Sequence, residues 1–175
     1  MHESGWGCWH FACLKEDRRI GSRFDTTEPA RGTCYTATDP LTALAEVLGY
    51  AILRGPNIAT IALEGLSVSC VTTTRPYRVA DLTRRSCPIL GTLGRELSVL
   101  PYATPQAWAH RWEQDGLDGV LYYPRHDAKT TARSIALFGP AEDPGEDDWP
   151  DPPKTPAGKY FRSFARAFGL MPGAV

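Results

Sequence analysis

The chain has 175 residues, a formal net charge of -1 at pH 7 and a sequence pI near 6.4. This length suits one domain that buries about two thirds of its unfolded surface. The near-neutral charge gives no electrostatic footprint for nucleic acid, so we expect no direct nucleic-acid contact. With no run of about 18 apolar residues and no basic leader before an apolar stretch, we expect a cytoplasmic protein without membrane contact.

Five cysteines are spread along the chain, at Cys8, Cys13, Cys34, Cys70 and Cys87. Their number is odd and none forms a Cys-x-x-Cys pair, so a reduced cytosolic set is the simplest account. Cys8, His10 and Cys13 are close in sequence, but a fourth ligand for a structural zinc site is missing. We therefore expect no metal.

The first half of the chain gives one strong strand and helix signal. The alternation at Trp9, Phe11 and Cys13 predicts a short strand with one apolar face. A second strand is predicted at residues 32–37, followed by a helix from Asp39-Pro40 to about Leu53. Aspartate is a good N-cap and proline fits the first helical turn.

Glu46 is the unusual residue of this helix. It is the only charged residue between positions 41 and 53, where apolar residues lie on nearly every side. A helix that is apolar all round is usually buried, and a buried, unpaired carboxylate is costly. Glu46 therefore needs a partner or a pocket, and Arg23 and the Tyr35 hydroxyl are the nearest candidates. An ordinary structural ion pair or a surface position is the alternative.

The second half alternates short strands with one helix. Thr104-Pro105 predicts an N-cap and first-turn proline for a helix over residues 104–115, with Trp108 and Trp112 in the core. The polar connection at 124–133 is the kind of loop on which sites are built. Further strands are predicted at 58–63, 67–73, 77–81, 118–123 and 134–138. No Gly-x-Gly-x-x-Gly follows a strand, so the fold class is α+β and not a Rossmann fold.

The composition changes after residue 139. Residues 140–157 are acidic and proline-rich and predict an extended linker that buries little. Residues 158–170 predict an amphipathic helix with phenylalanines on one face and Lys159, Arg162 and Arg166 elsewhere. Docking on the domain, or on a second copy, is favoured over a membrane surface. The predicted organisation is thus a main domain at 6–139, the linker and the terminal helix.

Several short motifs follow one another in chain order and together resemble a known family. They are Arg23-Phe24-Asp25, Gly32-Thr33-Cys34-Tyr35-Thr36-Ala37, Asp39-Pro40, Ala43-Leu44-Ala45-Glu46-Val47, residues 101–109, residues 116–120, Arg125-His126-Asp127 and residues 136–139. The ordered set resembles the RES domain, named for an Arg, a Glu and a Ser, over residues 9–139. The better-known members of that family are toxins of RES–Xre toxin–antitoxin pairs.

The resemblance implies a compact domain related to ADP-ribosyltransferases, which bind NAD in a cleft between sheets. It implies that NAD is the substrate and that the bond between nicotinamide and ribose is broken, with water or phosphate as acceptor. An Xre-type antitoxin is the implied protein partner and would cover the cleft. A homodimer is left open.

The residue types fit this chemistry. Breaking an N-glycosidic bond builds positive charge on the ribose, which a nearby carboxylate stabilises, and Glu46 is the candidate. Arg23 would bind the pyrophosphate with two charge-assisted hydrogen bonds. Tyr35 would pack against nicotinamide or ribose and lend its hydroxyl.

The sequence departs from the family at two positions. The family serine falls near Pro124, which has neither a hydroxyl nor an N–H, so Ser134 is the alternative. Relatives carry an arginine in the opening strand, where this chain has His10. Arg125 and His126 are further candidates for ligand contacts. These departures keep a second hypothesis open, a catalytically impaired RES-like module that binds a nucleotide or a protein, and a third, ADP-ribose transfer to a protein.

Overall fold

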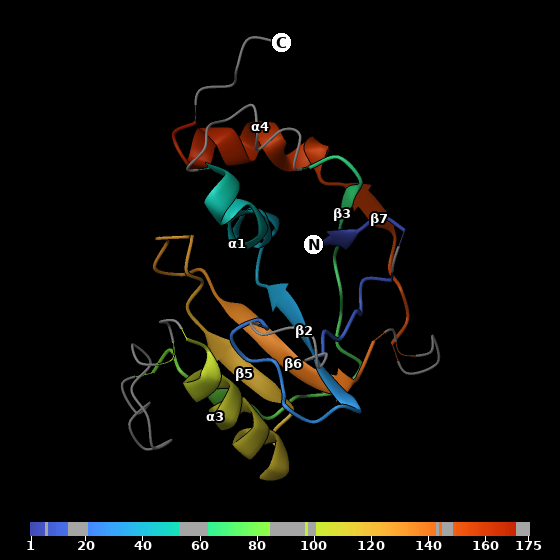
Figure 1. The fold of residues 1–175 in the computed structure, drawn as a ribbon. Helices are drawn as coiled ribbons and strands as arrows, with labels where there is room; N and C mark the ends of the chain where they lie inside the picture. Colours follow the sequence, from blue (N-terminus) through green and yellow to red (C-terminus); the bar gives the residue numbers. More distant parts are fainter. Residues whose placement is uncertain are drawn as a thin grey trace.

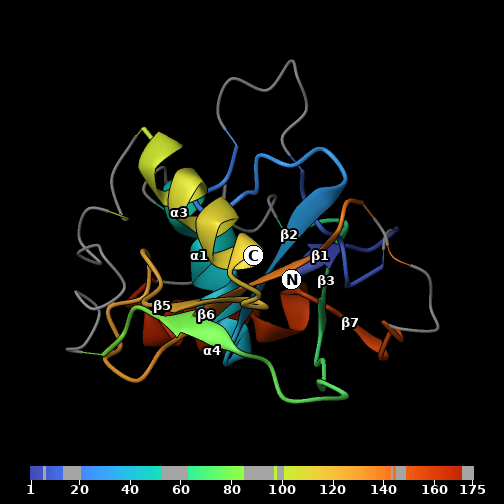
Figure 2. The same cartoon turned by 90° about the horizontal axis from the view of Figure 1, so that it is seen from below.

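The computed structural model describes residues 1–5, 7–13, 21–52, 63–84, 97, 101–142, 144 and 149–170. Its described helices are α1 (Pro40–Ile52), α3 (Ala103–Gln114) and α4 (Gly158–Ala167). They combine with two sheets, so the predicted α+β class is confirmed. In Figure 1, α4 lies across α1 at one end of the molecule and α3 lies at the other, and Figure 2 views the molecule from the α3 end.

The larger sheet has four strands in the order β2 (Arg31–Ala37), β6 (Ser134–Pro140), β5 (Gly119–Tyr122) and β4 (Val79–Asp81). The pairing of β2 with β6 is antiparallel over all seven residues of each strand. β6 pairs antiparallel with β5, and β5 pairs parallel with β4. This sheet therefore places β2, which leads into α1, beside β6, which follows the 124–133 loop.

The smaller sheet has three short strands in the order β1 (His2–Glu3), β3 (Leu66–Ser69) and β7 (Lys154–Pro156). Both pairings are antiparallel. The strand predicted at residues 9–13 is wrong, because this segment makes only isolated bridges, from Phe11 to Glu142 and from Ala12 to Thr33. The strand predicted at 58–63 lies almost wholly outside the described residues.

The buried apolar side chains of the described residues form three clusters, and the smallest contains Trp9, Phe11, Cys34 and Leu137. Of the two larger clusters, one packs α3 on the sheet through buried side chains that include Phe24, Trp112 and Phe138. The other packs α1 against α4 through Leu44, Leu48, Phe164 and their neighbours. The predicted docking of the terminal helix on the domain is therefore confirmed, and Trp112 is a core residue as expected.

Asp39 caps α1 as the sequence predicts. Its Oδ1 accepts hydrogen bonds from the backbone N–H groups of Leu41 and Thr42, both at 3.0 Å, and Pro40 occupies the first turn. The prediction for α3 is wrong in detail. This helix begins at Ala103 after Tyr102, which makes no side-chain capping bond, and Thr104 lies inside the helix.

The acidic segment contacts the rest of the domain at several of its described residues. The Trp149 ring lies 4.9 Å from Trp9 and 5.0 Å from Phe11, measured between ring centroids. Asp151 accepts a hydrogen bond from the Cys8 backbone N–H at 2.8 Å, and β7 pairs with β3. None of residues 149–156 is buried and most are exposed, as the composition predicts. Trp149, Asp151 and β7 nevertheless attach this segment to the domain, which the prediction of a linker did not include.

Cysteines in the described part of the chain are all free thiols, as predicted, at Cys8, Cys13, Cys34 and Cys70. Cys87 lies outside the described residues. Within the same residues, no helix has the length and apolar character needed to cross a membrane.

Replacing Asp39 with alanine should lower the free energy of unfolding by about 1 kcal/mol at neutral pH, because it removes the N-cap of α1. Partial burial raises the pKa of Asp39, but hydrogen bonds from Thr42 and the charge of Lys129 outweigh burial and leave it below the ordinary 3.8. The stabilisation is therefore present above this ordinary value and is lost as the pH falls through the lower folded pKa. Urea unfolding over a pH series measures both effects. Asp115→Ala, at an exposed surface ion pair, is the control, and equal losses in the two variants would contradict the cap assignment.

Candidate functional site

A cleft of about 370 Å³ opens between the turn before β2, the helix α1 and the loop after β5. We call it the Arg–Glu cleft, after two of the residues that line it. Its described lining residues are Gly21, Ser22, Arg23, Tyr35, Glu46, Val47, Tyr102, Tyr122, Arg125 and His126. The fold thus gathers Arg23, Tyr35, Glu46 and Arg125, which the sequence analysis singled out, around one space.

Arg23 is held at the wall of the cleft by aromatic rings. Its side chain is buried, at 9% exposure, and its guanidinium carbon lies 5.2 Å from the Tyr122 ring centroid and 5.8 Å from that of Phe24. Cation–π contacts of this kind fix the direction of the guanidinium plane. No carboxylate in the described part of the chain forms an ion pair with Arg23. The described residues therefore leave its positive charge for an anionic ligand.

The turn that carries Arg23 is fixed by hydrogen bonds on both sides. The Asp25 carboxylate accepts bonds from the Ser22 N–H at 2.6 Å and from the Tyr35 hydroxyl at 2.8 Å. The Tyr35 hydroxyl in turn accepts a bond from the Phe24 N–H at 2.8 Å. Burial, followed by the charge of Asp25, raises the pKa of Tyr35 well above its usual value, so the hydroxyl stays protonated and keeps donating.

These bonds change the interpretation of Tyr35. The sequence analysis named its hydroxyl as a partner for Glu46 and as a ligand contact, whereas the structure uses it to hold the turn around Arg23. Tyr35 still lines the cleft. A direct contact between its ring and a ligand stays a prediction.

Glu46 reaches the cleft from the middle of α1. Its Oε1 accepts a hydrogen bond at 2.8 Å from the backbone N–H of His126, in the loop after β5. The predicted partners, Arg23 and the Tyr35 hydroxyl, do not pair with it in the described residues. Its other oxygen, Oε2, has no hydrogen-bond partner among the described residues and remains for a ligand.

Tyr102 and Arg125 stand together at the edge of the cleft. Arg125 Nη1 donates to the Tyr102 hydroxyl at 3.2 Å, and the pair is largely exposed. The sequence analysis assigned no role to Tyr102, Tyr122 or Ser22, although each lines the cleft. Of these three residues, only Tyr102 could have been identified from the sequence, because it lies in one of the family motifs and just before a predicted helix.

Tyr122 lies beneath this site at the end of β5. Burial raises the pKa of its phenol, and the negative charge of Glu46 raises it further, while Arg23 acts in the opposite direction. The phenol is therefore neutral at ordinary pH and adds no charge to the cleft.

Ser134 and His10 lie outside the lining of the Arg–Glu cleft. Ser134 opposes Tyr122 across the β5–β6 pairing, is 1% exposed, and its hydroxyl has no hydrogen-bond partner among the described residues. The Ser134 hydroxyl is close enough to the Tyr122 phenol to act on the pKa of Tyr122 in the lowering direction, but it is not in hydrogen-bond geometry. Pro124, at the position expected for the family serine, is buried. The structure thus brings neither Ser134 nor His10 to the cleft.

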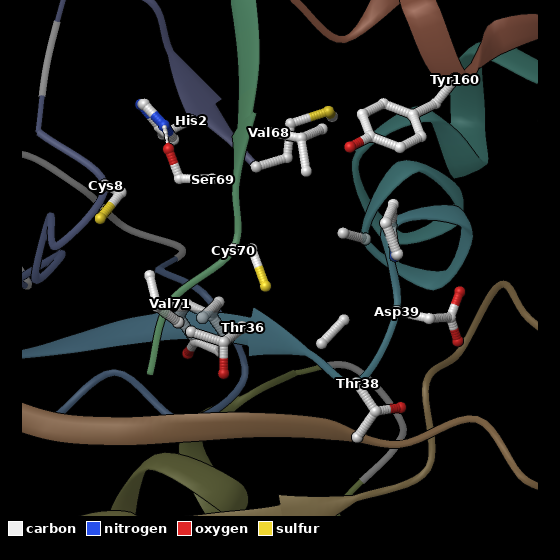
Figure 3. Close-up of a pocket in the computed structure, with 15 residues that line it drawn as sticks. His2, Cys8, Thr36, Thr38, Asp39, Val68, Ser69, Cys70, Val71 and Tyr160 are labelled. Carbon is white, nitrogen blue, oxygen red and sulfur yellow. Dashed lines mark hydrogen bonds between the residues drawn. The ribbon is translucent and has the colours of Figure 1, made fainter. Parts of the chain in front are cut away.

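A second cavity of about 290 Å³ lies between the start of α1 and the smaller sheet. Figure 3 shows the Cys70 thiol and the Tyr160 hydroxyl directed toward this space, and His2 joined to Ser69 by a hydrogen bond of 3.0 Å. No lysine or arginine is among the described residues that line it, and the Asp39 carboxylate is engaged in capping α1. The Arg–Glu cleft is therefore the better match for an anionic ligand.

Metal ligands are not clustered in the described residues, where no group of three or more His, Cys, Asp or Glu side chains could hold an ion.

Comparison with family models gives one finding that covers most of the chain. The model described as RES domain matches residues 3–160. The chain belongs to the RES domain family. This family is linked to NAD-related toxins, so membership points to NAD-related enzymatic activity. The match extends past residue 139 and includes β7, in agreement with the packed acidic segment. Comparisons with curated proteins and with solved structures gave no match.

Replacing Tyr35 with phenylalanine should lower the free energy of unfolding by about 1–3 kcal/mol, because the Phe24 N–H and the Asp25 carboxylate both lose a partner. Tyr123→Phe is the matched control. Its hydroxyl donates a weaker bond of 3.3 Å from a side chain that is 48% exposed, so a change within about 0.5 kcal/mol is expected. Urea unfolding measures both, and a small effect at both positions would show that the Tyr35 hydroxyl does not hold the turn.

Proposed function

We propose that this RES domain protein binds NAD in the Arg–Glu cleft and cleaves its nicotinamide–ribose bond, as a glycohydrolase or a phosphorylase. One observation carries the proposal. A guanidinium without a described ion pair, on Arg23, and a carboxylate with one uncommitted oxygen, on Glu46, line the same cleft from different elements. A dinucleotide with a pyrophosphate and a ribose that becomes cationic requires this combination.

Arg23 and Arg125 supply the positive charge for the pyrophosphate. A planar guanidinium donates two parallel hydrogen bonds to phosphate oxygens, and charge-assisted bonds of this type are stronger than neutral ones. Arg23 is pre-oriented by Tyr122 and Phe24, so little conformational freedom is lost when the ligand binds. Arg125 is exposed, lines the same cleft and is held there by its hydrogen bond to Tyr102.

Glu46 acts on the reacting sugar. The bond between the ribose C1 and the nicotinamide nitrogen breaks, and its electron pair leaves with nicotinamide, which becomes neutral. The ribose carbon gains positive charge that the Glu46 carboxylate stabilises. An oxygen of water or of phosphate then bonds to C1, giving ADP-ribose or its 1″-phosphate, and the proton of water passes to solvent.

We further propose that the protein is the toxin of a toxin–antitoxin pair in the cytoplasm, restrained by an Xre-type protein that covers the cleft. Val47 supports this view, since it lines the cleft and is 54% exposed. An apolar side chain at the edge of a polar cleft suits a protein cover better than a soluble ligand. A homodimer stays a prediction.

A second candidate function is a RES-like module that binds a nucleotide or a protein without turnover. The position of Ser134 and His10 outside the cleft lining favours it, because two of the residues expected from the family then make no ligand contact.

Glu46→Gln should lower the rate of nicotinamide release by about 100-fold or more, because the charge opposite the transition state is lost while the shape is kept. The assay follows nicotinamide and the ribosyl product by mass spectrometry, with and without phosphate, so the product also names the acceptor. Glu64→Gln, at an exposed turn away from the cleft, is the matched control and should retain full activity.

Two outcomes would change the assignment. Full activity in Glu46→Gln would exclude Glu46 as the stabilising carboxylate. Absence of release from folded wild-type protein under both conditions would favour the binding module.

Arg23→Ala should weaken NAD binding by about 10- to 100-fold, since a hydrogen bond between charged groups contributes about 1.5–3 kcal/mol. Titration calorimetry in the Glu46→Gln background separates binding from turnover. Arg162→Ala, on the exposed face of α4, is the control for removing one positive charge. An unchanged dissociation constant in Arg23→Ala would exclude the pyrophosphate assignment.

A further inference from the structure

One stripe of α1 faces the loop that follows β5. Thr42, Glu46 and Gly49 are spaced four and three residues apart, so they lie on the same side of the helix. Each of the three contacts His126 or Asp127, two neighbouring residues of the loop. Neither Thr42, Gly49 nor Asp127 has a role in the function proposed above.

The first contact is a hydrogen bond between side chains. The Thr42 hydroxyl lies 2.7 Å from Asp127 Oδ2 and 2.8 Å from Asp39 Oδ2, and Thr42 is fully buried. A hydroxyl has one proton and can donate to only one carboxylate at a time. Asp39 already accepts two hydrogen bonds from backbone N–H groups. Loss of the Thr42 hydroxyl should therefore affect the position of Asp127 more than that of Asp39. Asp127 also accepts the Lys129 N–H at 2.9 Å, and it thereby ties the turn of the loop to α1.

The second contact is the one that orients Glu46. Its Oε1 accepts the His126 N–H at 2.8 Å. A single hydrogen bond leaves the carboxylate free to rotate unless the donor itself is fixed. The contacts at Thr42 and Gly49, on either side of Glu46, fix this donor.

The third contact depends on the absence of a side chain. A Cβ atom on Gly49 would lie 2.3 Å from Cγ of His126 and 2.4 Å from its Cδ2, which no real Cβ atom tolerates. The atoms that it would meet lie at the base of the ring, and rotation of the ring about the Cβ–Cγ bond does not move Cγ, so ring rotation alone does not relieve the clash. Gly49 therefore allows the loop to lie against the helix, although glycine costs about 1 kcal/mol relative to alanine inside a helix.

We propose that Thr42, Gly49 and Asp127 are positioning residues, which hold the loop carrying Arg125 and His126 against α1 and thereby aim the Glu46 carboxylate. We call these contacts, together with the bond between Glu46 and His126, the α1 latch. The catalytic consequence rests on the proposed NAD cleavage. The placement of the loop against α1 rests only on the contacts described above.

The catalytic test compares variants of the full chain that alter the latch with matched controls. Thr42→Val removes the hydroxyl at nearly constant volume, and Thr42→Ser restores it. Gly49→Ala adds the clashing methyl group, and Gly158→Ala makes the same change in α4, where nothing lies within 4 Å of the new atom. We expect kcat to fall about 10- to 100-fold in Thr42→Val and Gly49→Ala, because a displaced catalytic group lowers the rate. KM should rise by a smaller factor than kcat falls, since Arg125 moves with the loop while Arg23 keeps its place. Thr42→Ser and Gly158→Ala should stay within about twofold of wild type.

A second readout tests the latch without any turnover. Amide hydrogen exchange, followed by mass spectrometry, should become faster at residues 125–129 in Thr42→Val and Gly49→Ala and stay unchanged in the two controls. Melting temperatures identify any variant whose whole fold is lost. Since alanine favours a helix over glycine, Gly49→Ala should not melt early for reasons internal to α1.

The outcomes separate the latch from the proposed function. Unchanged exchange at 125–129 in both variants would overturn the latch. Faster exchange with unchanged kcat would overturn its positioning role. A wild-type protein that releases no nicotinamide would sink the proposed function, and the exchange data would then decide by themselves whether the loop is latched to α1.

Discussion

The antiparallel pairing of β2 with β6 is the constraint on which the cleft depends. β2 carries Tyr35, whose hydroxyl holds the turn around Arg23, and it leads directly into α1 through the Asp39 cap. β6 follows the loop that carries Arg125 and His126. Because seven residue pairs fix one strand against the other, a shift of one residue would turn Tyr35 to the opposite face and separate the two walls of the cleft.

The two charged groups Arg23 and Glu46 line the same cleft without forming an ion pair with each other. Arg23 rests on aromatic rings and Glu46 on a backbone amide, so neither is neutralised by the other in the described residues. A protein that needed only stability would pair such groups, because each pays a desolvation cost when it is partly buried. Holding both charges apart and oriented is useful when a ligand carries the complementary charges. The close contact of His126 with Gly49 and the hydrogen bond from the Thr42 hydroxyl to Asp127 serve the same purpose. Through them the helix orients a carboxylate that it does not itself neutralise.

How far the sequence predicts this molecule depends on how local each signal is. The Asp39-Pro40 cap, the helix after it and the strand before it follow from neighbouring residues, and these predictions are confirmed. The presence of Arg23, Tyr35 and Glu46 in one cleft agrees with the resemblance to the family, which the match over residues 3–160 confirms. The partner of Glu46 could not be predicted, because it is a backbone N–H 80 residues away and every residue except proline offers one. The sequence predicts a ligand contact for the Tyr35 hydroxyl, because nothing in the residues around Asp25 indicates that this carboxylate accepts its hydrogen bond. For residues 149–156, the composition predicts their exposure but not their attachment to the domain through Trp149.

The packing of β7 has a consequence for the edge of the smaller sheet. β3 lies in the middle of the smaller sheet, so β7 forms one of its outer edges. Exposed strand edges offer unpaired N–H and C=O groups to any other chain, and natural sheets blunt them with short strands, lysine and proline. β7 is three residues long and reads Lys154-Thr155-Pro156. Proline cannot donate to a further strand. The segment that resembled a spacer in composition is therefore the part of this sheet that discourages edge-to-edge aggregation.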